Sequence, residues 1–313
     1  MTRVAALDCG TNSLRLLVAD VASGQLTDVE RRMEIVRLGQ GVDRTGMLAP
    51  PAIERTRVAL AGYAGSIERL GAERVRMVAT SATRDASNRA DFDRMVRATL
   101  GRPAEVISGD AEAALSFAGA VHGLERVGPH LVIDIGGGST EFVLGSTTVD
   151  RALSVDVGCV RLTERHLRGD PPTYGEIASA ESDVRMAIDR VRAVVPVHRA
   201  RTVVGLAGSV TTVAAVAMRL PTYDAGRIHG SVLPAARIRE VAGRLLAMSR
   251  AQRAALAVIH PGRVDVIGAG ALILRTIVDQ LAVEEVVVSE HDILDGIALS
   301  LAESSRQTGG GLP

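Results

Sequence analysis

The chain contains very few aromatic residues and no tryptophan. Aromatic side chains make up 2% of its 313 residues, while hydrophobic residues make up 47%, so the core must be built from aliphatic side chains. Strands rich in Val, Ile and Leu, covered by Ala-rich helices, would satisfy this requirement. The scarcity of aromatic rings argues against base stacking and aromatic sugar platforms as the main means of ligand recognition.

Cysteine and net charge are also scarce. The chain has two cysteines, Cys9 and Cys159, and its 36 basic residues balance its 36 acidic residues. Two thiols in a chain of this length argue against a disulfide framework and indicate a reducing, cytoplasmic environment. Free cysteines are often simply buried, so Cys9 is expected to fill the core rather than act as a nucleophile. Because the charges balance, any anion site must come from a local group of arginines and backbone N–H groups.

No apolar stretch has the length and continuity of a membrane span. The most apolar one, Val203–Met218, is interrupted by glycine and hydroxyl residues, whereas a spanning helix needs about 20 consecutive apolar residues. The first strand is expected from Val4 onward, which leaves no room for a signal peptide. A membrane is therefore not an expected partner. A nucleic acid is not expected either, because the balanced charge of the chain does not attract a polyanion.

Two segments of the chain match each other in the order of their residue types. Residues 7–13 read LDCGTNS, residues 133–141 read IDIGGGSTE, and a further apolar run follows each segment. Both patterns predict a strand, a tight turn and a second strand. The turn glycines expose backbone N–H groups that suit phosphate oxygens, and the leading aspartates, Asp8 and Asp134, suit a hard cation.

The ordinary interpretation of such a segment is a β-turn without any ligand, because Asp and Gly satisfy turn geometry by themselves. Three observations favour a site instead. The pattern occurs twice, each copy lies between apolar strands, and a third glycine-hydroxyl loop follows at residues 205–212 (GLAGSVTT). The sequence therefore predicts a duplicated fold that holds a phosphate chain and a metal ion between its halves.

The chain length favours two domains, and the order of the predicted elements supports this division. The first part is expected to contain strands at about 4–9, 13–20, 26–38, 75–79 and 105–107, with helices from Pro50 to a stop at Gly71, from Ser87 or Asn88 to Leu100, and from Asp110 to His122. Three strands followed by alternating helices and strands indicate a ribonuclease-H-like α/β unit. The second part restarts at Leu131 with strands at 149–155, 202–206 and 286–289 and helices near 158–168, 173–194 and 293–303.

The predicted fold is therefore α/β, with two ribonuclease-H-like domains and an active-site cleft between them, and the family that residues 8–13 and 134–141 resemble implies the actin-like ATPase type. The boundaries are placed at 1–125 and 126–292, with a last helix at 293–305 that packs back on the first domain. Residues 306–313 are expected to form a disordered tail.

Six segments together resemble the Ppx/GppA family of exopolyphosphatases and guanosine pentaphosphate phosphohydrolases. They are residues 8–13 (DCGTNS), 79–88 (ATSATRDASN), 107–113 (ISGDAEA), 134–141 (DIGGGSTE), 154–164 (SVDVGCVRLTE) and 228–230 (IHG). The resemblance covers essentially the whole chain. It departs from the family at Ala111, where many members have a glutamate before the one retained here as Glu112, and the chain does not extend to the helical HD-type domain of longer members. His291 and Asp292 are expected to be structural or capping residues rather than a remnant of that domain.

The resemblance implies hydrolysis of a terminal phosphoanhydride by water, a reaction in which positioning and charge neutralisation dominate. Glu112 takes the position of the family's general base, and its place in the first turn of a helix could also be explained by the helix dipole alone. Arg84 is expected to bind phosphate oxygens with its planar fork, and Glu141 to support the metal or the water. Asp8 and Asp134 are expected to hold Mg²⁺, with Mn²⁺ as the alternative.

The phosphate-binding residues are expected on three loops. They are Gly10, Thr11, Asn12 and Ser13 on the first turn, Gly136, Gly137, Gly138, Ser139 and Thr140 on the second, and Gly208 and Ser209 on the third. Ser209 precedes a predicted helix, whose N-terminus would favour a further phosphate of an extended chain.

Inorganic polyphosphate is the preferred substrate, and guanosine pentaphosphate (pppGpp) is the closest alternative. The scarcity of aromatic rings favours polyphosphate because base stacking is poorly supported. Two other hypotheses remain: a sugar kinase of the same superfamily, and a non-catalytic protein that binds the alarmones pppGpp and ppGpp. Residues 108–113 argue against the kinase, and the presence of all candidate carboxylates argues against the non-catalytic protein. A homodimer like those of relatives is a further expectation.

Overall fold

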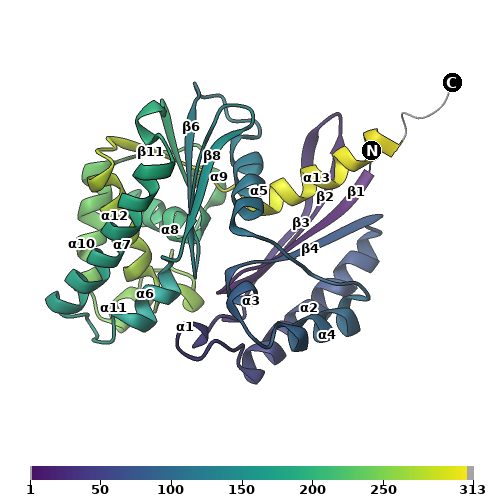
Figure 1. Cartoon of the computed structure of the whole chain (residues 1–313), viewed down its shortest axis with the longest axis horizontal. Helices are drawn as coiled ribbons and strands as arrows, with labels where there is room; N and C mark the ends of the chain where they lie inside the picture. The colour runs from purple at the N-terminus through teal and green to yellow at the C-terminus, as the bar shows by residue number, and fades with distance from the viewer. Residues whose placement is uncertain (1, 309–313) are drawn as a thin grey trace. The chain divides into compact units, whose positions relative to one another are not determined.

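The computed structural model describes residues 2–308 of the chain, with side chains up to Ala302. The structure divides into two compact units, drawn in Figure 1. The first unit contains the residues up to Gly119 and those from Asp292 on, and the second contains Ala120–His291. The last helix of the chain thus belongs to the same unit as the first strand.

The first unit is built on a mixed five-stranded sheet with the strand order β3-β2-β1-β4-β5. Its strands are β1 (Thr2–Cys9), β2 (Ser13–Ala22), β3 (Gln25–Ile35), β4 (Arg74–Ala79) and β5 (Glu105–Val106). Strands β1, β2 and β3 form an antiparallel meander, and β4 and β5 continue the sheet in parallel to β1.

Helices cover both faces of this first sheet, because side chains of β1 alternate between two hydrophobic clusters. Ala5 and Leu7 pack with α2 (Pro50–Leu70) and α4 (Arg89–Leu100), whereas Val4 and Ala6 pack with α5 (Gly109–Val121) and α13 (Ile293–Thr308). Figure 1 shows α2 and α4 on one side of the sheet and α13 on the other. Two short helices, α1 (Val42–Thr45) and α3 (Ser81–Asp85), lie in the connections.

The second unit repeats this topology and adds one strand at the edge. Its sheet has the order β10-β11-β9-β6-β7-β8, formed by β6 (His130–Ile135), β7 (Thr140–Gly145), β8 (Val149–Val155), β9 (Thr202–Leu206), β10 (Val232–Pro234) and β11 (Glu285–Val288). Strands β6, β7, β8, β9 and β11 take the places of β1 to β5 in the first unit. The prediction of two ribonuclease-H-like α/β domains is therefore confirmed.

One large aliphatic cluster joins this second sheet to its helices, and Phe142 is the aromatic residue within it. The helices are α6 (Cys159–Arg165), α7 (Tyr174–Val194), α8 (Ala207–Ala217), α9 (Ala225–Ile228), α10 (Ala235–Ala247), α11 (Arg250–Ala254) and α12 (Ile267–Gln280), with 3₁₀ turns η1 (Val197–Arg199) and η2 (Pro261–Arg263). In Figure 1, α7, α10 and α12 form a layer beside the sheet. Val, Leu, Ile and Ala thus supply the core, as the composition predicts.

Several predicted boundaries are confirmed and others are wrong. The strands at 149–155 and 202–206 match β8 and β9, and α2 ends where Gly71 adopts φ 65°. The strand predicted to reach residue 38 ends at Ile35, because the next N–H groups donate to the carbonyl of Asn12 in the first turn. Residues 306–308, at the start of the expected disordered tail, continue α13, and the rest of that tail lies outside the described residues.

Asn88 precedes α4 as expected, but its side chain does not cap the helix. It bonds instead to the backbone of Leu48, accepting from the N–H at 2.8 Å and donating to the carbonyl at 3.0 Å. Separately, no helix among residues 2–308 has the length and apolar character needed to cross a bilayer.

Candidate functional site

The first glycine turn joins β1 to β2 and has a fixed backbone. The N–H of Gly10 donates to the carbonyl of Ser13 at 3.0 Å, and the carbonyl of Thr11 accepts from Gly39 at 2.8 Å. The N–H groups of Thr11 and Asn12 have no acceptor within residues 2–308. Unpaired backbone donors at a tight turn form a concave site that suits an anion.

The second glycine turn, between β6 and β7, has the same internal hydrogen bond. The N–H of Gly136 donates to the carbonyl of Ser139, again at 3.0 Å. The first N–H groups of α6 donate to the carbonyls of Gly136 and Gly137 at 3.0 and 2.9 Å. In a trans peptide the N–H lies opposite the carbonyl, so the N–H groups of Gly137 and Gly138 point away from α6. Neither of these two donors has an acceptor in the described part of the chain.

Two residues of the following segment hold the second turn in place. A methyl group on Gly158 would lie 2.3 Å from the carbonyl oxygen of Gly137, so only glycine allows this close approach. Arg161, on α6, donates through Nε to the carbonyl of Gly138 at 2.8 Å. The open N–H groups of the turn are therefore presented by a rigid support rather than by a free loop.

Asp8, at the end of β1, is buried and contacts an arginine across the hairpin. Arg15 lies opposite it on β2 and donates from Nε and Nη2 to the same oxygen, Oδ2, at 3.0 and 2.7 Å. Burial raises the pKa of Asp8, and Arg15 opposes this effect. The other oxygen, Oδ1, is buried and has no hydrogen-bond partner. A carboxylate oxygen in this state offers a ligand to a cation or a water molecule.

Arg15 also donates to Asp292, which precedes α13. Asp292 accepts the N–H of Leu294 at 3.0 Å, so its predicted capping role is confirmed. Burial acts to raise the pKa of Asp292, but Arg15 and Arg31 hold it below the usual value. Arg15 thus links two buried carboxylates of the first unit.

Asp134 takes the place of Asp8 in the second unit, but a second acid lies opposite it. The register of β6 and β7 pairs Asp134 directly with Glu141, which is 1% exposed and accepts from the hydroxyl of Ser154 at 2.7 Å. Side chains at directly opposed positions lie on one face with Cβ atoms about 5 Å apart, and two like charges there repel. A bound cation would relieve this repulsion.

Glu112 and Arg84, both predicted site residues, are brought together by the fold. Glu112 lies in the first turn of α5 and is 8% exposed. Arg84 lies in the short helix α3, and its Nη1 donates to Oε2 of Glu112 at 3.1 Å and to the carbonyl of Ile107 at 3.0 Å. The prediction that Arg84 binds phosphate oxygens is untested, and the structure adds its contact with Glu112.

The third glycine loop begins α8 and lies under an arginine that the sequence did not suggest. A methyl group on Gly208 would lie 1.2 Å from Nη1 of Arg263, so the guanidinium rests on this glycine. The buried side chain of Ser209 lies against Gly270 of α12, where a methyl group would be 2.4 Å from Oγ. The N-terminus of α8, which favours anions, thus has a cation beside it.

Arg15, Arg161 and Arg263 are the residues that the sequence analysis missed. Arg15 could have been found, because a two-strand hairpin around the turn places it opposite Asp8. Arg161 and Arg263 reach their glycine turns through contacts 23 and 55 residues away along the chain, for which the sequence has no local signal. As expected, Cys9 is buried, and burial raises the pKa of its thiol, which disfavours a nucleophilic role.

Two α/β units of one topology, each with a buried aspartate followed by a turn of open N–H groups, place the chain in the duplicated ribonuclease-H-like class. The model of the Ppx/GppA phosphatase family matches residues 17–305. The chain belongs to this family.

Its relatives are similar over nearly the whole length. The chain is 54% identical to "Exopolyphosphatase 2" of Mycobacterium tuberculosis over 96% of this chain and 99% of that protein. Among solved structures, an exopolyphosphatase-like protein is 41% identical with a TM-score of 0.95, covering 97% of this chain and 99% of that one. The Aquifex aeolicus member of the family is 31% identical with a TM-score of 0.82, covering 97% and 98%.

Proposed function

We propose that the chain is an exopolyphosphatase that releases orthophosphate from the end of inorganic polyphosphate. The observation that carries the proposal is the buried carboxylate of Glu112 beside Arg84, in a chain with two turns of open N–H groups. The relative that is 54% identical over its full length bears the name of this activity.

In the proposed reaction, Glu112 accepts a proton from the water that attacks the terminal phosphorus. The bond between that phosphorus and the bridging oxygen breaks, and the leaving chain keeps the bridging oxygen. Phosphoryl transfer needs positioning and electrostatic stabilisation more than covalent chemistry. Arg84, 3.1 Å from Glu112, offsets the charge of this buried base and would contact a phosphoryl oxygen near it.

The backbone turns bind the phosphate chain in this proposal. Thr11 and Asn12 supply the open N–H groups of the first turn, Gly137 and Gly138 supply those of the second, and Gly208 and Ser209 lie at the N-terminus of α8. Arg263, resting on Gly208, adds a cation at this third loop. Because the fold already orients these hydrogen-bond donors, no free energy is needed to reorganise them when the anion binds.

Mg²⁺ is the proposed metal, with Mn²⁺ as the alternative, and Asp8 and Asp134 would hold it. The unpartnered Oδ1 of Asp8 and the pairing of Asp134 with Glu141 both fit a cation. Among the residues that the structure describes, no group of three or more His, Cys, Asp and Glu side chains gathers to hold an ion. Mg²⁺ commonly takes one or two carboxylates and completes its shell with water and substrate phosphates. When bound, it would neutralise charge on the phosphoryl oxygens.

The test is a comparison of initial rates of orthophosphate release from long-chain polyphosphate and from pppGpp at equal concentrations of chain ends. We expect the higher kcat/KM with polyphosphate. A higher kcat/KM with pppGpp would show that pppGpp, not polyphosphate, is the preferred substrate. ADP formation that depends on an added sugar would show that the chain is a sugar kinase. Tight alarmone binding without any phosphate release would indicate a non-catalytic protein.

Cytoplasmic localisation is part of the same proposal. Both cysteines are buried and unpaired, as is usual where thiols stay reduced. Fractionation of cells that express the tagged chain tests this point, and its recovery outside the cytoplasm would contradict it.

A further inference from the structure

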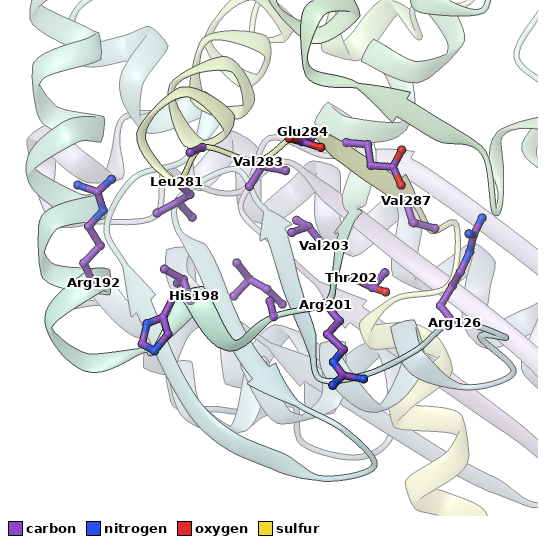
Figure 2. A pocket seen from close by; sticks show the side chains of 15 residues that line it. Arg126, Arg192, His198, Arg201, Thr202, Val203, Leu281, Val283, Glu284 and Val287 are labelled. Atoms are coloured by element: carbon purple, nitrogen blue, oxygen red, sulfur yellow. The ribbon is translucent and has the colours of Figure 1, made fainter.

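A hollow of about 520 Å³ lies in the second unit, apart from the residues assigned above. Figure 2 shows its labelled side chains, which come from four parts of the chain. They are the segment before β6, the end of α7 with η1, the start of β9, and the connection from α12 into β11. A cavity of this size falls in the range of sites that bind small molecules.

The hollow and the glycine turns lie at opposite ends of the same strands. Leu131 near the start of β6 and Thr202 at the start of β9 line it, whereas Asp134 and Gly208 lie at or beyond the other ends of β6 and β9. Since a strand rises about 3.3 Å per residue, Leu131 and Ile135 are about 13 Å apart. The hollow is therefore separate from the phosphate-binding loops of the second unit.

Basic side chains occupy much of its rim. Arg126, Arg192, Arg201 and His198 line the hollow, and Figure 2 shows Arg192 and His198 on one side with Arg126 on the other. Within the described chain, neither Arg126 nor Arg201 has an ion-pair partner. Arg192 lies 3.8 Å from Asp189, a loose and exposed contact. These guanidinium groups are available to an oxyanion, which their planar fork can bind through two hydrogen bonds.

The rest of the lining is acidic or apolar. Glu284 and Glu285 lie beside the ends of α7 and α12, where helix carbonyls add partial negative charge. Val203, Val283 and Val287 contribute apolar surface. A simple anion would use only the arginines, whereas a dipolar molecule with an apolar body would use all three kinds of surface.

We propose that this pocket binds a metabolite-sized organic anion, with its phosphate or carboxylate on the arginines, its N–H donors on Glu284 and Glu285, and its apolar body on the valines. A phosphate ester and a carboxylate both accept hydrogen bonds from arginine, so either group satisfies the proposal. The proposal does not depend on the exopolyphosphatase reaction.

The experiment is isothermal titration of the whole chain with four probes: adenosine 5′-monophosphate, leucine, glucose 6-phosphate and inorganic phosphate. The first two combine an oxyanion, N–H donors and an apolar body, and they separate the phosphate source from the carboxylate source. We expect one of them to bind at least tenfold more tightly than glucose 6-phosphate or phosphate. If neither binds, or if phosphate binds as tightly as both, the proposal is wrong.

Variants locate the binding site. In R126Q/R201Q the probe that binds is expected to lose roughly tenfold in affinity per lost arginine contact, and in E284Q/E285Q a smaller loss is expected. Arg190→Gln, an exposed arginine on α7 outside the lining, is the matched control and should bind normally. Glu112→Gln should also bind normally. Unchanged affinity in R126Q/R201Q, or lost affinity in Glu112→Gln, would contradict the assignment.

Discussion

Asp8 and Asp134 occupy the same position in two copies of one hairpin, but the residue opposite Asp8 is basic and the residue opposite Asp134 is acidic. Across the strand pair, Asp8 meets Arg15 and Asp134 meets Glu141. Arg15 offsets the charge of the first aspartate, whereas a carboxylate lies opposite the second. At the scale of single residues, the two halves of the fold are therefore not equivalent.

Replacing Arg15 by Met should destabilise the protein strongly. Arg15 pairs with the buried carboxylates of Asp8 and Asp292, and removing one partner of a buried ion pair costs roughly 3–5 kcal/mol. Thermal or urea unfolding measures this loss at pH 7.

The effect of Arg15→Met should also depend on pH. Arg15 helps to hold the pKa of Asp292 below its usual value, so the stability it provides is present above the ordinary aspartate pKa of about 3.9 and is lost as the pH falls through the lowered folded-state value. The difference between wild type and variant should therefore narrow in acid. A difference that stays constant from pH 7 to pH 3 would show that packing, not charge, explains it.

Replacing Asp134 by Asn should raise the Mg²⁺ concentration needed for half-maximal activity. The change keeps the size of the side chain but removes a carboxylate ligand of the proposed metal. Asp150→Asn is the matched control, since Asp150 lies on β8 in a long, exposed pair with Arg199. An unchanged metal titration for Asp134→Asn would remove Asp134 from the metal site.

The sequence predicts the residues of each turn but not the partners that reach the turn from elsewhere. Asp8, Gly10 and the second glycine run follow from local patterns, because a strand-turn-strand segment determines its own geometry. The contacts of Arg84 with Glu112 and of Arg263 with Gly208 depend on tertiary packing. No spacing rule within the chain predicts such contacts.

At the scale of elements, a close contact between two helices of the first unit sets the position of Glu112. A methyl group on Gly296 of α13 would lie 2.0 Å from the carbonyl oxygen of Leu115 on α5, and one on Gly119 would lie 1.8 Å from that of Asp292. The two backbones therefore touch through glycines. Since Glu112 lies in the first turn of α5, this contact fixes the helix that carries the proposed base.

Gly296→Ala should push α13 away from α5, lower stability by roughly 1–3 kcal/mol through overpacking, and reduce turnover by displacing Glu112. Unfolding curves and phosphate-release assays measure the two effects. Gly62→Ala is the matched control, because nothing lies within 4 Å of its added methyl and alanine favours the helix. Equal stability changes in both variants would show that the α5–α13 contact is not tight.

The order of the helices and strands could be predicted from the sequence, but the residues at which they end were less predictable. Apolar runs with regular turns between them determine the strands and long helices, which explains the agreement at β8 and β9. The end of β3 and the contacts of Asn88 depend on hydrogen bonds to segments distant in sequence, namely the first turn and Leu48. Such competition between local and distant partners cannot be resolved from a single sequence.

At the scale of the whole molecule, one α/β topology occurs twice, and the two copies differ in the charged residue opposite the aspartate of the turn. The shared strand order and the identical turn hydrogen bonds of 3.0 Å indicate duplication. The first unit contains Glu112, Arg84 and Asp8, and each unit contains one glycine turn with two open N–H groups.

The most direct test of this account is the turnover of Glu112→Gln on polyphosphate. The amide keeps the size of the side chain but cannot accept the proton of the attacking water, so turnover should fall roughly 10²–10⁴-fold while the melting temperature stays close to that of wild type. Asp110→Asn, an exposed acid in the same helical turn, should keep normal activity. Near-wild-type phosphate release by Glu112→Gln would contradict the account.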